Sequence, residues 1–301
     1  MQAFFQNLVI GIQTGAVYAL IAVGYTMVYG VLRLINFAHA DVYMVGAYVG
    51  LMASQAIGME TSRTPVGLAA VLVISMASCA LLGVVIERFA YRPLRNAPRI
   101  TALITAIGVS LLLEALALLI WGPTPRNFPR AGVTRPIPFL GLEISPKYLI
   151  ILAVTTVLMA ALWYVVTRTR VGKAMRAVSH DREAAALMGI DTNRIVVVTF
   201  ALGSSLAGAA GFLVSAITNV KIDPYVGVFW GLKSFVAAVL GGIGSIPGAM
   251  LGGMVMGISE TYVAASPGGS SWRDAIAFVL LILILIFRPA GILGRSTVEK
   301  V

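Results

Sequence analysis

The segment Phe278-Val-Leu-Leu-Ile-Leu-Ile-Leu-Ile-Phe287 is apolar at every position, so a helix formed by it has no polar face. The run Leu149-Ile-Ile-Leu-Ala-Val-Thr-Thr-Val-Leu158 is similar. Helices that are apolar all round lie in lipid or inside a helix bundle. The whole chain of 301 residues is 59% hydrophobic and only 11% charged, which is too little polar surface for a soluble globule. The sequence therefore predicts an all-α polytopic membrane protein in which residues 1–301 form a single transmembrane domain.

Hydrophobic stretches predict about seven full transmembrane helices and, in addition, one broken or re-entrant helix pair between Phe229 and Tyr262. We expect the full spans near Leu8–Val31, Val42–Ile57, Val66–Ile86, Ile100–Trp121, Tyr148–Val166, Ile195–Thr218 and Ile276–Phe287.

Basic residues indicate how these spans are oriented. The formal net charge is +10, and basic side chains gather in two loops between spans, at Arg88, Arg92, Arg95 and Arg99, and at Arg168, Arg170, Lys173, Arg176, Arg182 and Arg194. This placement is typical of the positive-inside bias of membrane proteins and not of a nucleic-acid-binding face. We therefore expect both loops and the C-terminus, with Arg288 and Arg295, in the cytoplasm. The N-terminus and the loops Gly58–Pro65, Gly122–Lys147 and Asn219–Val226 are then expected outside, although Arg126, Arg130 and Arg135 run against the charge rule.

The second basic loop contains a polar island, Val171–Asp191, between two apolar segments. Ser179 and Asp181 are candidate N-caps, Glu183 falls in the first turn, and Gly189 is a natural stop at C′. The residues Glu183-Ala-Ala-Ala-Leu-Met188 are strong helix formers. The island therefore predicts a short helix, which is either a docking surface for a partner or simply a connection between spans.

A glycine-rich segment interrupts the last hydrophobic third of the chain at Gly241-Gly-Ile-Gly-Ser-Ile-Pro-Gly248. It predicts two short helices that meet at a break, and backbone freed at membrane depth must be buried in protein or face a watery cavity. The break can lie beside a transport pathway. Alternatively, Gly248-x-x-x-Gly252 and Gly253-x-x-x-Gly257 can serve close helix packing. A similar break is possible at Leu34–Met44, because the span that follows it is short.

Three ionisable residues, Glu114, Lys233 and Glu260, fall within apolar spans. A charge at membrane depth costs roughly 2.5–3.5 kcal/mol on insertion scales, so we expect each to face protein or water. Lys233 and Glu260 can form an ion pair if the two short helices fold as a hairpin. Glu114 can be a proton-coupling acid or a buried hydrogen-bonding group. As candidates for a translocation path we take Asn36, His39, Asp41, Lys233, Gly241, Gly242, Gly244, Ser245, Pro247 and Glu260.

Signatures of enzymatic chemistry are missing from the sequence. There is no Gly-x-x-x-x-Gly-Lys-Ser/Thr loop for a nucleotide. His39 and His180 lie in separate loops without ligand-spaced carboxylates, so no metal site is expected. The lone Cys79 falls in a predicted span and is interpreted as a small core residue. We expect no catalytic residues and no cofactor bound by this chain.

Several motifs together resemble the permease subunits of bacterial high-affinity branched-chain amino acid importers, the LivH family. The resemblance covers nearly the whole chain. It is carried by Tyr25-Thr-Met-Val-Tyr-Gly, Ile35-Asn-Phe-Ala-His-Ala-Asp-Val-Tyr-Met, Ile86-Glu-Arg-Phe-Ala-Tyr-Arg-Pro-Leu-Arg, Ala237-Ala-Val-Leu-Gly-Gly-Ile-Gly-Ser-Ile-Pro-Gly-Ala and Pro289-Ala-Gly-Ile-Leu-Gly-Arg. The polar island is similar to the Glu-Ala-Ala loop of ATP-binding-cassette (ABC) importers, although Val196-Val-Val-Thr-Phe-Ala stands where the general motif has Ile-x-Leu-Pro.

This resemblance implies a permease domain whose cytoplasmic loop 168–193 contains a coupling helix within residues 172–190. The coupling residues would be Gly172, Lys173, Arg176, Ser179, Asp181, Arg182, Glu183, Ala184, Ala185, Leu187 and Gly189. It also implies a homologous second permease, two cytoplasmic ATPases that use ATP, a periplasmic amino-acid-binding protein, and a place in the bacterial inner membrane. The alternative is an ion-coupled secondary transporter or channel that uses Glu114 or Glu260.

Overall fold

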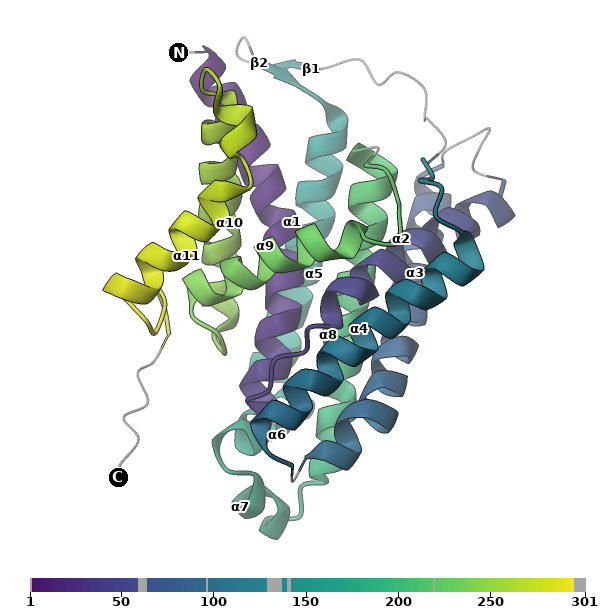
Figure 1. The fold of residues 1–301 in the computed structure, drawn as a ribbon, viewed down its shortest axis with the longest axis vertical. Helices are drawn as coiled ribbons and strands as arrows, with labels where there is room; N and C mark the ends of the chain where they lie inside the picture. Colours follow the sequence, from purple (N-terminus) through teal and green to yellow (C-terminus); the bar gives the residue numbers. More distant parts are fainter. Residues whose placement is uncertain are drawn as a thin grey trace.

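The computed structural model describes residues 2–58, 64–95, 97–128, 137–139, 142–218 and 220–294, and Figure 1 shows their arrangement. The α-helices are α1 (Gln2–Leu32), α2 (His39–Ala56), α3 (Pro65–Ile86), α4 (Arg99–Trp121), α5 (Pro146–Arg168), α6 (Arg170–His180), α7 (Arg182–Leu187), α8 (Thr192–Leu213), α9 (Val226–Gly241), α10 (Ile246–Ala265) and α11 (Ala275–Phe287). The π-helices η1 (Glu87–Tyr91) and η3 (Val214–Thr218) extend α3 and α8, and η2 (Arg92–Leu94) and η4 (Gly269–Trp272) are single 3₁₀ turns. One antiparallel hairpin, β1 (Ile137–Phe139) and β2 (Leu142–Ile144), precedes α5.

The centre of the bundle is formed by α1, α2, α8 and α10. α1 packs mainly on α10 and α8, and α8 also packs on α2 and α3. Small residues make these close approaches possible. A side chain at Gly257 would collide with the backbone of Gly15, and one at Gly253 would collide with Ala19. The helices therefore meet backbone to backbone, as the small-residue spacing of α10 predicts.

The number of full spans differs from the expected seven. Within the described residues, five helices are long and apolar enough to cross a membrane: Gln2–Leu32, Pro65–Leu94, Ile100–Trp121, Pro146–Arg168 and Thr192–Thr218. The predicted span Ile276–Phe287 is only the 13-residue α11, which is roughly 20 Å long at 1.5 Å per residue and shorter than a hydrocarbon core. The predicted span Val42–Ile57 is α2, which has 18 residues and is mostly buried.

Both predicted breaks are present. α9 ends at Gly241 and α10 begins at Ile246, and the intervening Gly242 and Gly244 have φ angles of 103° and 97° that suit glycine. The earlier break is shorter than expected: it covers residues 33–38, because α2 already begins at His39. In Figure 1, α9 lies across α1, whereas α10 runs alongside it.

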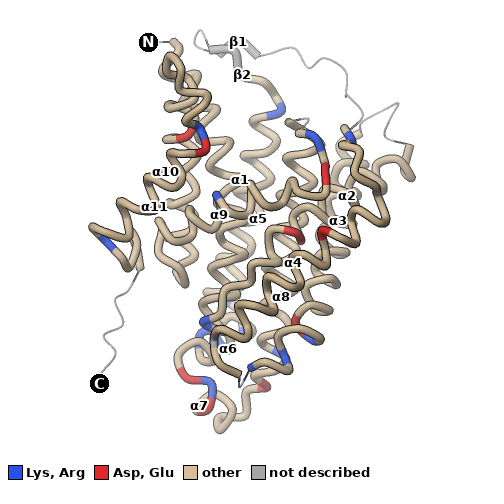
Figure 2. The backbone as a smooth tube through the Cα atoms, in the orientation of Figure 1, with Lys and Arg blue, Asp and Glu red and all other residues tan. Residues whose placement is uncertain are grey.

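The two ends of the bundle differ in charge. The N-terminus and the β1–β2 hairpin lie at one end of the long axis, and α7 lies at the other (Figure 1). Figure 2 shows Lys and Arg gathered around α6 and α7 and few charges along the helices between the ends. This separation is what the positive-inside interpretation requires. The predicted loops Gly58–Pro65 and Gly122–Lys147 lie partly outside the described residues, as do Asn219 and Arg295.

Candidate functional site

The loop between α5 and α8 begins with a tight turn. Thr169 is the N-cap of α6, and its hydroxyl accepts a hydrogen bond from the Gly172 amide at 3.1 Å. Gly172 is buried, and a side chain there would collide with the carbonyl groups of Val165 and Val166 at the end of α5. The turn therefore requires glycine at this position, and it fixes the direction in which α6 leaves α5.

α6 is held against the ends of two spans. Arg176 donates a hydrogen bond to the Val166 carbonyl of α5, and Ser179 donates one to the Gly30 carbonyl of α1. A cation is favourable at a helix C-terminus because it completes unpaired carbonyls and faces the negative end of the dipole. The inner face of α6 buries Met175 and Val178. The helix therefore forms a platform beneath α1 and α5.

α7 projects from this platform as one short helix with defined ends. The Asp181 carboxylate accepts a hydrogen bond from the Ala184 amide at 2.9 Å, which is an N-cap. Gly189, with φ of 80°, donates to the Ala186 carbonyl, and Ile190 donates to the Ala185 carbonyl. These two bonds are the Schellman pattern of helix termination.

The surface of α7 is apolar at its tip. Leu187 is 89% exposed and Met188 is 83% exposed, whereas Ala185 is buried against the loop. Asp181, Glu183 and Ala184 are exposed beside this tip, and so are Lys173 on α6 and Gly189. The loop therefore presents two exposed apolar side chains among charged residues, and α6 holds them in a fixed position.

The structure confirms part of the predicted loop and corrects the rest. Asp181 is the N-cap and Gly189 is the C′ residue of α7. The prediction of Ser179 as an N-cap is wrong, because its hydroxyl lies within α6 and binds α1. The island is two helices and not one, and Gly172 is buried inside it. The sequence signal that could have revealed α6 is the spacing of its three buried residues, Gly172, Met175 and Val178.

An ion pair and a hydrogen bond of Arg95 connect the end of α3 to this loop. Arg95 forms a salt bridge with the fully buried Glu87 of η1 and donates a hydrogen bond to Asn193 at the start of α8. Burial, followed by the charge of Arg95, lowers the pKa of Arg182. The two basic loops predicted from the sequence therefore lie at the same end of the fold and in contact.

The charged residues near the glycine break form one network. Lys233 on α9 lies 2.9 Å from Glu260 on α10, so the predicted ion pair is present. Glu260 is fully buried and also pairs with Arg273 at 2.6 Å, and it accepts a hydrogen bond of 2.6 Å from the Tyr18 hydroxyl on α1. Lys233 additionally contacts Asp274 at 2.6 Å, and this hydrogen bond lowers the pKa of the exposed Asp274 carboxyl. The network joins α1, α9, α10 and the turn before α11.

The first part of the glycine turn is covered by protein. Ile292 donates to the Leu240 carbonyl and Leu293 donates to the Gly241 carbonyl, each at 2.9 Å. The segment after α11 therefore caps the C-terminus of α9, and Gly242 packs against its backbone. Ser245 is the N-cap of α10. Of the two alternatives for this break, the structure has close packing at Gly241 and Gly242, while Gly244 and Pro247 lie exposed.

Asn36, His39 and Asp41 lie together in the interior, at the start of α2. Their exposures are 2%, 1% and 0%. Tyr91 donates a hydrogen bond of 3.0 Å to Asn36 Oδ1, and Ser110 donates one to Asp41 Oδ2. These three candidates are therefore grouped with one another, and among the described residues no hydrogen bond or salt bridge joins them to the Glu260 network.

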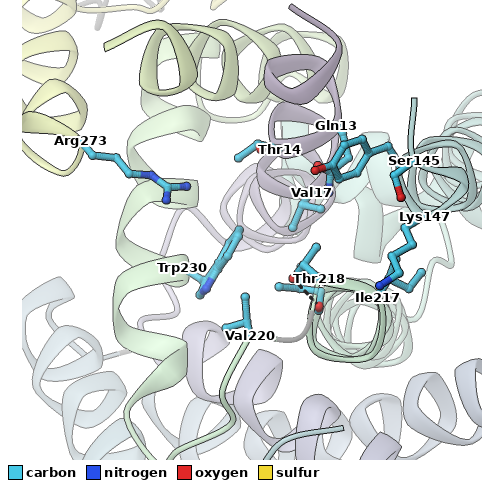
Figure 3. A pocket seen from close by; sticks show the side chains of 12 residues that line it. Gln13, Thr14, Val17, Ser145, Lys147, Ile217, Thr218, Val220, Trp230 and Arg273 are labelled. Carbon is cyan, nitrogen blue, oxygen red and sulfur yellow. Dashed lines mark hydrogen bonds between the residues drawn. The ribbon is translucent and has the colours of Figure 1, made fainter. Parts of the chain in front are cut away.

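A cavity of about 420 Å³ lies near the end of the bundle that carries the N-terminus. It is lined by α1, α5, η3, α9 and Arg273 (Figure 3). Val17, Val214, Ile217, Val220 and Trp230 supply apolar surface. None of these lining residues is recognisable as a site residue from the sequence, because each belongs to an ordinary apolar or loop segment when it is considered alone.

Comparisons with known proteins agree over the full length. A sequence family described as the permease component of branched-chain amino acid transport systems matches residues 7–285. The high-affinity branched-chain amino acid transport system permease protein BraD of Pseudomonas aeruginosa is 43% identical over 99% of this chain and 98% of its own length. The LivH permease protein of Escherichia coli is also 43% identical, with the same coverage.

More distant similarities extend to other transport proteins. The ribose import permease protein RbsC of Escherichia coli is 26% identical over 91% of this chain and 83% of its own length. A solved structure described as an inward-facing metal-chelate type ABC transporter aligns over 95% of this chain and 89% of that chain, with 16% identity and a TM-score of 0.52. This last likeness concerns the fold alone.

Proposed function

The chain belongs to the family of permease components of branched-chain amino acid transport systems, and from this premise we propose that α7 is the element through which separate ATPases drive it. As a member of this family the chain is a multi-pass membrane subunit of an ABC transport system and not an enzyme. Because the chain belongs to this family, the alternative of an ion-coupled transporter that uses Glu114 or Glu260 is not supported.

The observation that carries the proposal is the apolar tip of α7. A leucine and a methionine exposed at 89% and 83% on a water-facing loop form a site at which a partner can bury apolar surface. Elsewhere the exposed large hydrophobic residues mostly lie on the long helices, where lipid can cover them. Lipid would not cover the tip of α7, because this helix lies beyond the ends of α1 and α5 (Figure 1).

The anchoring of α6 explains how force on α7 would reach the spans. Arg176 joins α6 to α5, Ser179 joins it to α1, and Asp191 caps the following α8. Arg95 adds the connection to α3 through Glu87. A displacement of α7 would therefore act on four spans at once. The proposed coupling surface consists of the exposed residues Lys173, Asp181, Glu183, Ala184, Leu187, Met188 and Gly189; Gly172, Arg176, Ser179, Arg182 and Ala185 support it.

The rest of the proposed assembly follows from the family and the charge pattern. A homologous second permease would lie beside this one in the bacterial inner membrane, with two ATPases on the α7 side and a periplasmic amino-acid-binding protein on the other. The N-terminus would then be periplasmic and the C-terminus cytoplasmic. ATP would be bound by the ATPases, and the transported solutes would be branched-chain amino acids.

The test is the variant Leu187→Asp, measured for co-purification of the ATPases and for ATP-dependent leucine uptake in proteoliposomes containing the full complex. Loss of an apolar anchor at the centre of an interface costs at least about 1.4–2 kcal/mol, so ATPase association should weaken about tenfold or more. The matched control is Ile57→Asp, an exposed apolar residue at the end of α2, which should leave association unchanged. Normal association and uptake by Leu187→Asp would refute the coupling role of α7.

A further inference from the structure

We propose that the cavity between α1, α5, η3 and α9 is a receiving site for the free amino acid, in which the Lys147 ammonium binds the carboxylate of the solute. The inference rests on the proposed function, since it assumes that amino acids enter from the side of the N-terminus. It assigns a ligand position to Lys147 and Gln13, which belong to neither the coupling loop nor the Glu260 network, although Arg273 of that network also lines the cavity.

The volume of the cavity suits a small solute. At about 420 Å³ it lies within the range of roughly 300–1,000 Å³ found for small-molecule sites, which are typically apolar with a few placed polar groups. Val17, Val214 and Ile217 give branched aliphatic surface, and Trp230 adds an aromatic wall that packs on Tyr18 and Tyr43. Such a lining favours an aliphatic side chain over a charged or strongly polar one.

The charge of the cavity points to an anionic group. Lys147 and Arg273 are the charged residues of its lining, and the lining contains no acidic residue. Arg273 is partly neutralised by Glu260 at 2.6 Å. By contrast, no carboxylate pairs with the Lys147 ammonium among the residues that the structure describes. An ammonium without a partner beside an apolar cavity is a ready donor to a carboxylate.

A neutral polar group also faces the cavity. Gln13 on α1 is only 6% exposed, and its side chain lines the cavity. A hydrogen bond between this amide and a bound group would contribute to the free energy of binding. Figure 3 shows Gln13 and Lys147 on the same side of the site, with Arg273 opposite. Gln13 can therefore accept a hydrogen bond from the ammonium group of an amino acid whose carboxylate binds Lys147.

The position of the cavity agrees with the entry of a solute. α5 begins there and η3 ends there, close to the β1–β2 hairpin at the N-terminal end of the bundle (Figure 1). η3 is a π-helix, and its residues Val214, Ile217 and Thr218 line the cavity. Short π-helical turns occur frequently at functional sites, because they place side chains that a regular helix would turn away.

Thiol labelling tests the site without relying on transport. Ile217→Cys is introduced into the full complex, and its reaction with a small neutral thiol reagent is followed by peptide mass analysis; the buried Cys79 is the internal reference. Leucine and 4-methylpentanoate, which has the carboxylate without the ammonium, should both slow labelling. Leucinamide, which lacks the carboxylate, should not.

Adding Lys147→Gln should raise the leucine concentration needed for half-protection about tenfold or more, since a charge-assisted hydrogen bond contributes about 1.5–3 kcal/mol. The control Lys221→Gln changes an exposed lysine of the neighbouring loop and should leave protection unchanged. Labelling unaffected by leucine, or equal protection with and without Lys147, would overturn the proposal. ATPase co-purification, measured on the same samples, separates this failure from failure of the coupling proposal, because Lys147→Gln should not alter it.

Discussion

The inner and outer helices of this protein are all apolar enough to cross a membrane, but they are buried to very different extents. In the most apolar 18-residue stretches of the spans that contain α1 and α8, 72% of the residues are buried, against 28%, 17% and 22% for those of α3, α4 and α5. The buried inner spans are the less hydrophobic ones, with mean hydropathies of 1.7 and 1.9 against 2.6, 2.5 and 2.5, so hydrophobicity does not explain their burial, and side-chain size does. Inner helices carry glycine and alanine where backbones meet, whereas α4 carries large residues such as Leu119 that are exposed to lipid or to another subunit.

This contrast teaches that shape, more than hydrophobicity, determines which helices become central. Lipid is as apolar as leucine, so no hydrophobic force drives one span against another. Close packing supplies the attraction instead, and small residues permit it. Mutations that change size should therefore act on the inner helices, and equal changes on the outer helices should have little effect.

The largest effect is expected from Gly257→Leu in α10. A side chain at Gly257 collides with the backbone of Gly15, and no rotamer change can relieve a collision with backbone. We expect loss of the folded chain, measured as monodisperse protein after mild detergent extraction. The matched control is Gly108→Leu in α4, where an added Cβ meets nothing within 4 Å. If both variants fold equally well, the packing contrast is wrong.

The second prediction compares two acids within spans. Glu260 in α10 is fully buried with two cationic partners and the Tyr18 hydroxyl, whereas Glu114 in the outer α4 is half-buried. Removing one member of a buried ion pair costs about 3 kcal/mol, because the remaining charges lose their partner. Glu260→Gln should lower the free energy of unfolding in detergent by about this amount. Glu114→Gln should change the free energy of unfolding by less than about 0.5 kcal/mol and should leave ATP-dependent uptake intact. Loss of uptake in this variant would instead support the hypothesis that Glu114 couples transport to an ion.

Much of this architecture could be predicted from local sequence. Apolar runs gave the long helices, Asp181 and Gly189 gave the ends of α7, and the glycine-rich segment gave the break between α9 and α10. Each of these signals lies within a few residues of the feature that it predicts, because caps and turns are decided by neighbouring backbone groups. The Lys233–Glu260 pair was also accessible, since a break between two short helices predicts a hairpin that brings them together.

Features built from distant segments could not be predicted in this way. Ile292 and Leu293 cap α9 through main-chain hydrogen bonds, which any residue other than proline can donate, so no side chain marks them. The cavity is lined from four helical elements and one arginine after η4, and it exists only when all of them are assembled. α11 was expected to cross the membrane because its apolar pattern is complete, yet only 13 residues are helical.

The third and smallest prediction isolates the packing contribution from hydrophobic transfer. Leu20 on α1 is fully buried, and Leu111 on α4 is 59% exposed, so the same change to alanine can be made on an inner and an outer helix. In soluble proteins buried Leu→Ala changes cost about 2–5 kcal/mol, part of which is lost transfer from water and part the cavity. Within a membrane the transfer part is absent, so Leu20→Ala should cost about 2 kcal/mol, near the lower end of that range. Leu111→Ala should cost well under about 1 kcal/mol, because lipid fills the space that the side chain leaves. Unfolding free energies measured in the same detergent decide the matter: equal losses would mean that α4 is packed as tightly as α1, through a second subunit that covers it.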